Sequence, residues 1–308
     1  MNPTLWITGI AGFTGRHLVT FLKGLTDKPR IVGLDLADRV PDDIDTYYKA
    51  DLSQPEEVAD IAQSDRPSWI IHLAGLMPPA NEADMWQVNV GSTVSLLQGL
   101  ASTGLRETRI VCIGSAAEYL PKSSDPLTES DLCGGSSLYG RIKWAQTLLA
   151  ITLGSELGLP IMVVRPFNLI GPGLSTNLVA GWLCDQFARS EVEDIRIGNL
   201  ESARDFIDIR DAVSAYWLVT QKGRPGEIYN VCSGTPATVK QLCDLLSEIS
   251  GKSPRIMVDP KRIREADIPI CYGDYTKIKQ ATGWQSHIQL RESLTAMLDF
   301  RQQSTDMR

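Results

Sequence analysis

Tyr139 and Lys143 are the two residues of this chain whose types and spacing best suit acid–base chemistry. Residues four apart share one face of a helix, and residues 144–157 carry apolar side chains at helical spacing with no proline before Pro160. A phenol has a pKa of about 10, and an ammonium group one turn away stabilises the phenolate and lowers that pKa. The spacing therefore favours a tyrosine that exchanges a proton; an ordinary helix start is the alternative.

A glycine-rich turn near the start of the chain suits a nucleotide. Residues 4–8 form a short apolar run typical of a strand, three glycines spaced GxxGxxG follow, and a helical pattern continues over 18–22. In this order of elements, glycines let backbone N–H groups approach a pyrophosphate, and the helix N-terminus favours the anion. The spacing is one residue longer than the fingerprint GxGxxG. The predicted contacts are Gly9, Gly12, Phe13, Thr14 and Gly15.

An acidic residue ends the next expected strand. Residues 30–34 are apolar-rich, and Asp35 follows them, twenty residues after Gly15. A carboxylate at this distance can bind the ribose hydroxyls of an adenosine, and it repels a 2′-phosphate. The sequence therefore predicts NAD(H) as the preferred cofactor, with NADP(H) as the alternative because Arg39 is nearby; Asp35 could also cap a loop.

The composition sets broad limits. The chain has 308 residues, of which 43% are hydrophobic and 22% charged, and its net charge is −7. These values are ordinary for a globular protein, and the negative charge argues against a nucleic-acid partner. We find neither a signal pattern nor an apolar run long enough for a bilayer. The six cysteines form no CxxC pair and no metal-ligand spacing with histidine, so we expect reduced thiols in a cytoplasmic enzyme without a metal.

Strands and helices are expected to alternate along the first half. Further strands are expected at 46–50, 69–73, 109–113 and 161–164, with helices at 55–62 and 90–100. This alternation predicts an α/β fold of the Rossmann type, a doubly wound parallel sheet that binds ligands beyond the carboxyl ends of its strands. Residues suited to nucleotide chemistry fall at these ends: Gly9, Asp35, Gly75 and Ser115.

Other residues near these strand ends are predicted to contact the cofactor. Asp51 can contact the adenine amine or cap the next helix, and the small residues Ala74 and Gly75 after the strand at 69–73 would let a nucleotide lie against the backbone. Asn89 stands where the helix over 90–100 is expected to begin, and can cap its N–H groups. The predicted contacts are Asp51, Leu52, Leu73, Ala74, Gly75 and Asn89.

Together these motifs make the chain resemble the extended short-chain dehydrogenase/reductases, a superfamily that includes NAD-dependent epimerases and dehydratases, over essentially its whole length. The resemblance implies a Ser-Tyr-Lys triad. In it Ser115 holds the substrate oxygen, Tyr139 exchanges its proton, and Lys143 lowers the tyrosine pKa and binds the nicotinamide ribose. A loop serine can instead bond its own backbone.

The second half resembles the nucleotide-sugar members of this superfamily. Residues 165–173 resemble their RPFNxxGPG motif and residues 203–211 their RDFxxVxD segment. The resemblance implies that Asn168 contacts the diphosphate or sugar and that Arg204 binds a phosphate, whose oxygens suit a guanidinium. A structural pair between Arg204 and Asp205 is the alternative. Pro166 is expected at the cofactor, and the predicted substrate contacts are Met77, Glu118, Asn168, Arg204 and Arg264.

Within the superfamily the chain is most similar to the GDP-4-keto-6-deoxymannose reductases, on residues 197–206, 215–217 and 226–234. This implies NAD(P)H-dependent reduction of the 4-keto group of a nucleotide-linked 6-deoxysugar. The chain departs from these reductases at two places, so its sugar can differ from theirs: an apolar stretch over 76–79 replaces a polar one, and Leu120 replaces a glycine.

Three other functions remain alternatives. A 4-epimerase with tightly bound NAD would use the same triad. A dehydratase needs an acid near the triad, and Glu118 lies one position off that pattern because Ala117 occupies it. A non-catalytic cofactor-sensing protein would usually lack the Tyr–Lys pair.

The predicted architecture has two parts that exchange segments. The cofactor domain covers 1–165 and is rejoined by about 205–232, and the substrate-binding region covers 166–204 and 233–308. The resemblance also implies a homodimer formed through the helices near 90–100 and 139–157.

Overall fold

A seven-stranded parallel sheet forms the centre of the computed structural model, which describes residues 3–122, 125–262 and 268–306. The strand order is β10-β6-β5-β4-β1-β2-β3, and every neighbouring pair is parallel. The chain order reverses between β1 and β4, and this switch point is where doubly wound sheets bind their ligands. The strands are β1 (Thr4–Thr8), β2 (Arg30–Asp35), β3 (Thr46–Lys49), β4 (Trp69–His72), β5 (Arg109–Ile113), β6 (Ile161–Pro166) and β10 (Ile228–Val231).

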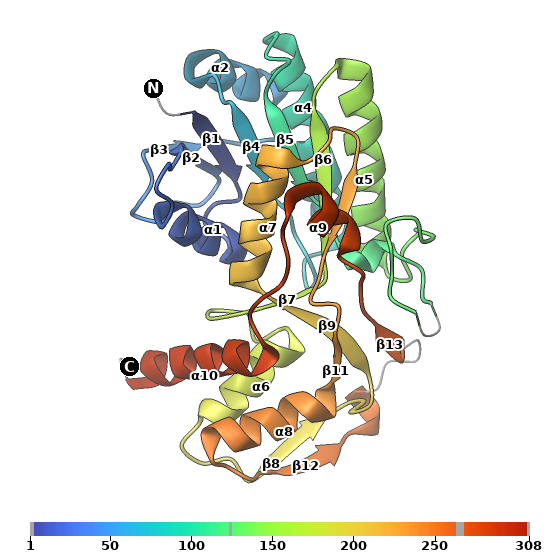
Figure 1. Ribbon diagram of the computed structural model, residues 1–308. Coiled ribbons are helices and arrows are strands. Elements are labelled where there is room, and N and C mark those ends of the chain that lie inside the picture. The colour runs from blue at the N-terminus through green and yellow to red at the C-terminus, as the bar shows by residue number, and fades with distance from the viewer. Residues whose placement is uncertain (1–2, 123–124, 263–267, 307–308) are drawn as a thin grey trace.

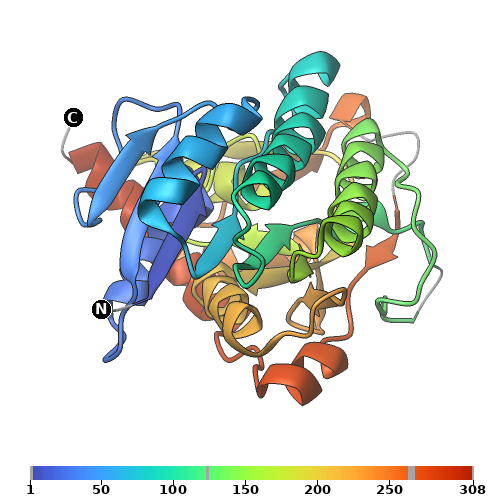
Figure 2. The ribbon, with the colours of Figure 1, turned by 90° about the horizontal axis from the view of Figure 1, so that it is seen from above.

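Helices cover both faces of this sheet (Figures 1 and 2). On one face lie α1 (Phe13–Lys23), α7 (Ile209–Lys222) and α9 (Thr276–Thr282), and on the other α2 (Pro55–Asp65), α4 (Ser92–Ser102) and α5 (Leu138–Leu157). Successive side chains of a strand point to opposite faces. Leu5 and Ile7 therefore pack with α1 and α7, whereas Trp6 packs with α2 and α4. Burial on both faces explains why the strands are almost continuously apolar.

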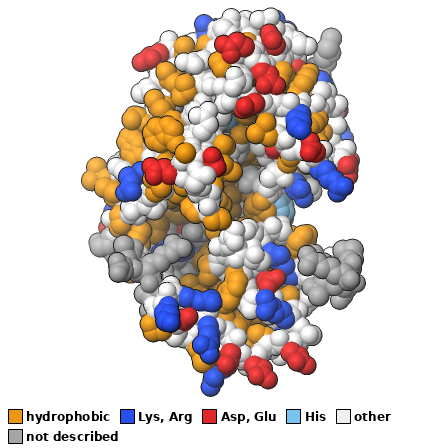
Figure 3. Space-filling model, turned by 180° about the vertical axis from the view of Figure 1, so that it is seen from behind, with side chains coloured by type: hydrophobic (Ala, Val, Ile, Leu, Met, Phe, Trp, Pro, Cys, Tyr) orange, Lys and Arg blue, Asp and Glu red, His pale blue; other side chains and the backbone are white. Residues whose placement is uncertain are grey.

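A smaller part lies beyond the carboxyl ends of these strands, below the large sheet in Figure 1. Its strands are β7 (Asn168–Ile170), β8 (Asp194–Ile197), β9 (Ala203–Asp208), β11 (Pro236–Thr238), β12 (Arg255–Val258) and β13 (Ile270–Cys271). Its helices are α6 (Val179–Ala188), α8 (Val239–Ser250) and α10 (Leu290–Asp306). They share a separate core that includes Leu183, Phe187 and Leu242. Seen from behind, the surface is hollowed between the two parts (Figure 3).

The predicted fold class, a Rossmann-type doubly wound sheet, is confirmed, and the strands expected at 4–8 and 109–113 have the expected bounds. The exact division into domains stays a prediction. The segment expected to rejoin the cofactor domain supplies α7 and β10 to the large sheet, but β9 pairs with β7, β11 and β13. The helix α9, expected in the substrate-binding region, packs on α7. Within the described part of the chain, no helix has both the length and the apolar character of a bilayer span.

Candidate active site

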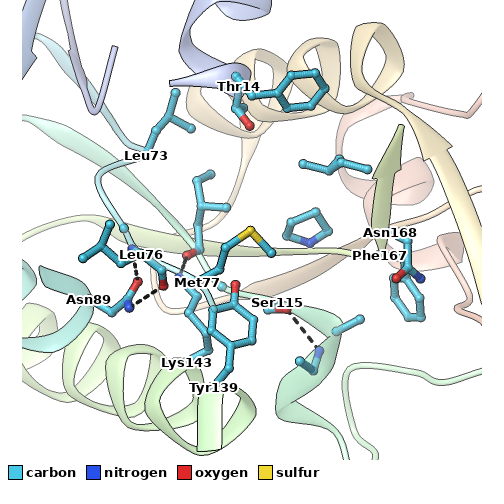
Figure 4. A pocket seen from close by; sticks show the side chains of 18 of the residues that line it. Thr14, Leu73, Leu76, Met77, Asn89, Ser115, Tyr139, Lys143, Phe167 and Asn168 are labelled. Carbon is cyan, nitrogen blue, oxygen red and sulfur yellow. Dashed lines mark hydrogen bonds between the residues drawn. The ribbon is translucent and has the colours of Figure 1, made fainter. Parts of the chain in front are cut away.

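A cavity of about 1240 Å³ opens where the strands of the large sheet end, between the two parts of the molecule. Its volume exceeds the roughly 300–1,000 Å³ of ordinary small-molecule pockets, so a cofactor and a substrate could lie in it together. The glycine turn and the ends of β2, β4, β5 and β6 form one side, and β9 with residues 268–272 forms the other. Figure 4 shows part of this lining.

The glycine turn forms the end of the cavity beside β1. Gly9 has a φ of +66°, and a Cβ there would lie 2.7 Å from the backbone nitrogen of Ala74, so only glycine fits. A Cβ on Gly15 would lie 2.4 Å from the carbonyl oxygen of Ile10. Because glycine has no Cβ, α1 can begin close to the end of the strand. No side chain caps the N-terminus of α1 at Gly12. This cradle of backbone N–H groups fits a pyrophosphate. Phe13 and Thr14, the other predicted cofactor contacts of this turn, line the cavity here.

Two carboxylates lie along the cofactor side of the cavity. Asp35 ends β2, and its oxygens accept hydrogen bonds from the backbone N–H groups of Ala11 at 2.9 Å and Ala37 at 3.1 Å. These bonds fix the carboxylate beside the glycine turn. Asp51 accepts from the backbone N–H of Ser53 at 2.9 Å, and α2 begins two residues later, at Pro55. Asp51 therefore orders the turn before α2 without capping the helix itself.

Asn89 does not cap a helix, contrary to the sequence-based expectation. The helical stretch begins earlier, with α3 (Glu82–Trp86), and a single π-helical turn (Gln87–Gly91) joins α3 to α4. The Asn89 amide donates to the carbonyl oxygens of Leu76 at 2.8 Å and Met85 at 2.7 Å, and its oxygen accepts from the N–H of Leu76 at 3.2 Å. The wide turn lets this side chain reach the loop after β4, so Asn89 fixes the wall of the cavity that holds Met77.

The three residues of the predicted triad meet on this cavity (Figure 4). Ser115 follows β5 and caps a short helical turn, where its hydroxyl accepts from the N–H of Ala117 at 3.1 Å. The helix α5 begins with Ser137 as its cap, so Tyr139 lies in the first turn and Lys143 one turn later. The helix starts six residues earlier than the predicted segment 144–157, which places both residues on it.

Burial is the largest influence on the pKa values of Tyr139 and Lys143. It raises the pKa of Tyr139 to about 12, although the bond to the Ser115 hydroxyl lowers it. Burial lowers the pKa of Lys143 to about 8, against the opposing charge of Glu118. The Lys143 ammonium donates to the carbonyl oxygen of Ile113 at 2.6 Å and to the side chain of Gln146. The expected lowering of the Tyr139 pKa is therefore not found in the protein alone, because desolvation of the phenolate outweighs other effects.

Glu118 is not a substrate contact in this structure. Its carboxylate accepts from the backbone N–H of Ser115 at 2.7 Å, from the Thr147 hydroxyl at 3.0 Å and from Nε of Arg165 at 2.7 Å. The side chain is fully buried and lies outside the cavity lining. The capping geometry turns it back towards Ser115, away from any ligand. This position also removes the acid that the dehydratase alternative needed.

Two of the predicted substrate contacts, Asn168 and Arg204, lie on the wall opposite the glycine turn. Asn168 is exposed, and its amide donates to the carbonyl oxygen of Asp205 at 2.9 Å. Arg204 donates to the carbonyl oxygens of Ala203 at 2.8 Å and Ile268 at 2.6 Å. Both residues line the cavity, together with Met77.

The Asp205 carboxylate accepts from the backbone N–H and the hydroxyl of Ser233 and from the N–H of Gly234. These bonds satisfy the buried Asp205 carboxylate. The structural pair between Arg204 and Asp205, which was the alternative, is therefore not needed to explain its burial. Arg264 lies outside the described residues.

Apolar residues of the lining were missed by the sequence analysis. Leu36 is 62% exposed directly after Asp35, and its place after the ribose-binding position was the available signal. On the substrate side the cavity is lined by Leu178, Val179 and Tyr272. No motif marks them, because apolar side chains at element ends resemble ordinary core residues.

Comparison with known proteins shows the family to which the chain is related. Residues 5–232 match the model of the NAD dependent epimerase/dehydratase family. The chain is 30% identical over 307 residues to the GDP-6-deoxy-D-mannose reductase of Pseudomonas aeruginosa, covering 97% of each chain. It is 27% identical over 279 residues to the GDP-6-deoxy-D-talose 4-dehydrogenase of Aggregatibacter actinomycetemcomitans, covering 90% of each. The solved structure of RMD from Pseudomonas aeruginosa complexed with NADPH superposes with a TM-score of 0.86 at 29% identity, over 98% of this chain and 99% of that one.

Proposed function

The chain belongs to the NAD dependent epimerase/dehydratase family, and on this premise we propose that it reduces the 4-keto group of a nucleotide-linked 6-deoxysugar. The reductase from Pseudomonas aeruginosa and the 4-dehydrogenase from Aggregatibacter actinomycetemcomitans both carry GDP-6-deoxysugars in their names, and both match nearly the whole chain. These relatives support a GDP-4-keto-6-deoxymannose-like substrate.

The observation that carries the proposal is the place of Tyr139, which lines the cavity together with Ser115 and lies one helical turn before Lys143. The phenol is neutral at physiological pH, and burial raises its pKa further, to about 12. A neutral phenol at physiological pH is a proton donor, and donation to a ketone oxygen is what a reduction needs.

The chemistry at the substrate then follows from the chain's own residues. Bound NAD(P)H supplies the hydride that the carbonyl carbon accepts. The hydroxyls of Ser115 and Tyr139 hold the ketone oxygen and stabilise the negative charge that develops there. The Tyr139 proton moves to that oxygen, which completes the alcohol. Lys143 places a positive charge one helical turn from the tyrosine and stabilises the phenolate left behind.

The cofactor side favours NAD(H). The Asp35 carboxylate is held beside the glycine turn, where it suits two ribose hydroxyls and repels a 2′-phosphate. NADP(H) remains the alternative, because the related RMD was solved with NADPH.

On the substrate side we assign Arg204 and Asn168 to the diphosphate or sugar, because both line the wall opposite the glycine turn. A guanidinium suits phosphate oxygens. Met77, which is 45% exposed, extends from the loop after β4 into the cavity (Figure 4), so we place it against the sugar.

One assay tests the proposal. The purified protein is incubated with GDP-4-keto-6-deoxymannose and NADH or NADPH, and nicotinamide absorbance and the sugar product are followed by optical spectroscopy and NMR. We expect one reduced nicotinamide to be oxidised for each alcohol formed. A protein that retains NAD through purification and interconverts nucleotide sugars without net oxidation is a 4-epimerase, and this result would overturn the proposal.

A further inference from the structure

Four buried polar residues lie behind Lys143, and the proposed reaction assigns none of them a role. They come from four different elements and are linked to one another by hydrogen bonds: Thr8 on β1, His72 on β4, Thr93 on α4 and Gln146 on α5. Burying polar side chains in a core is costly unless each is hydrogen-bonded. Their donors and acceptors determine the direction of each hydrogen bond.

Thr93 fixes these directions. Its hydroxyl carries a single hydrogen, which it donates to the carbonyl oxygen of Asn89 at 2.7 Å. The same oxygen must therefore accept from its other two neighbours. They are Nε2 of Gln146 at 2.9 Å and Nε2 of His72 at 3.0 Å.

The tautomer of His72 follows from this assignment. Its Nε2 carries the proton, so its Nδ1 accepts from the Thr8 hydroxyl at 2.8 Å. The Thr8 oxygen accepts in turn from the N–H of Ala74 at 3.1 Å, at the edge of the cofactor cradle. The imidazole is neutral, because burial and the nearby charge of Lys143 lower the pKa of His72 to about 3.

The Gln146 amide can therefore face only one way. Its nitrogen is committed to Thr93, so its oxygen points at Lys143 and accepts from the ammonium. An ammonium has three donors. Gln146 and the carbonyl oxygen of Ile113 take two of them, and the remaining one is left for the cavity that Lys143 lines.

We propose that Gln146 is a positioning residue that holds the Lys143 ammonium in its working orientation, and that Thr93 and His72 lock the Gln146 amide. This rests on the proposed function for the claim that Lys143 takes part in the reaction. The chain of bonds also ties the lysine to the backbone at Ala74 and so aligns two walls of the same cavity.

The first test is a direct titration of Lys143 that needs no substrate. Lysine is labelled with ¹³C at Cε, and the Lys143 resonance is assigned by its loss in Lys143→Arg. The charged and titratable groups near Lys143 are Glu118, Cys112, His72 and, one helical turn away, Tyr139, and none of them is changed in the variants at positions 146 and 93.

We expect Gln146→Leu to lower the pKa of Lys143 below its value of about 8, because the ammonium loses an acceptor, and Gln146→Glu to raise it. Thr93→Val should also lower this pKa, because the amide is then free to turn. The matched control is Thr220→Val. Thr220 is equally buried and donates to the carbonyl oxygen of Tyr216, four residues earlier, but it lies on α7.

The second test is turnover. Loss of a hydrogen bond to a charged group is worth about 1.5–3 kcal/mol, so Gln146→Leu should lower kcat by about 10- to 100-fold with little change in the substrate KM. A folded Gln146→Leu protein with the wild-type Lys143 titration would overturn the proposal. If Gln146→Leu does not fold, the Lys143 titration is measured in Thr93→Val instead, and an unchanged pKa there would overturn the proposal. Because the titration is independent of substrate, a wild-type protein inactive on the ketosugar would contradict the proposed function without changing this result.

Discussion

The Glu118 carboxylate accepts a hydrogen bond from the backbone N–H of Ser115 at 2.7 Å and forms a buried ion pair with Arg165, also at 2.7 Å. A charged side chain thus supports the serine that is proposed to bind substrate. Breaking a buried ion pair by removing one partner costs about 3–5 kcal/mol, because the other charge is left uncompensated.

We therefore expect Glu118→Ala to reduce the free energy of unfolding by several kcal/mol and to lower kcat in the molecules that remain folded. Glu118→Gln is the matched variant, because its amide oxygen can still accept from Ser115. It should lose stability but keep most of the activity per folded molecule. Denaturant unfolding and turnover on the same preparations check this, and equal activity in the two variants would show that Glu118 does not position Ser115.

His72 should make stability depend on pH. Its pKa is lowered to about 3 in the folded protein, so below about pH 6.5 the unfolded chain binds a proton that the folded chain does not. This contribution to stability is complete above pH 6.5 and is lost as the pH falls towards 3, by up to about 4–5 kcal/mol. Unfolding should be measured across this range for the wild type and His72→Asn. The difference in the free energy of unfolding between the two proteins should become smaller as the pH falls. A difference that does not change with pH would contradict a neutral buried His72.

Asp35 should set the cofactor preference. We expect wild-type protein to prefer NADH over NADPH and Asp35→Ala to reduce or reverse that preference, because the repulsion of a 2′-phosphate is removed. Asp38→Ala is the control, since Asp38 follows the same strand but pairs with Lys49 outside the cavity lining. Binding constants for both cofactors are the measurement. An unchanged ratio in Asp35→Ala would refute the ribose assignment.

The outer face of α5 should form a dimer interface. Leu148 is 48% exposed at its middle, and α5 packs beside α4, the other helix expected in the interface. Sedimentation at micromolar concentration should give a dimer for the wild type and a monomer for Leu148→Glu. Val258→Glu, at an apolar position 50% exposed on β12, should leave the dimer intact. A wild-type monomer would count against the prediction.

Local pattern was enough to predict the large sheet and the cofactor side. The strand at residues 4–8, the glycine turn after it and the acid at position 35 are close in sequence, so local pattern places them at the ends of two neighbouring strands, β1 and β2. The pair Tyr139 and Lys143 was also predictable, because both lie on one helix.

Interactions between distant segments could not be predicted in the same way. Glu118 was expected at the substrate, but its partner Arg165 is 47 residues away, and their pairing draws it into the core. The role of Asn89 depends on a π-helical turn that no periodicity revealed. In the sequence Gln146 is like any other polar residue of a helix, and only its contacts with Lys143 and Thr93 distinguish it.

The proton donor is the centre of the proposed mechanism. Tyr139→Phe removes one hydroxyl and keeps the ring, so the fold and the NADH affinity should change little. The loss should appear in kcat, at about 10²–10⁴-fold, which is the usual contribution of general acid–base catalysis.

Lys143→Ala should lower both kcat and NADH affinity, because the resemblance gives the lysine a ribose contact as well.

The most direct test is the kcat of Tyr139→Phe on a 4-ketosugar that the wild type reduces, with melting temperature and NADH affinity measured on the same preparation. The proposed mechanism predicts a fall of at least about a hundredfold in a protein that is folded and binds NADH normally. A Tyr139→Phe protein with near-normal kcat would contradict it.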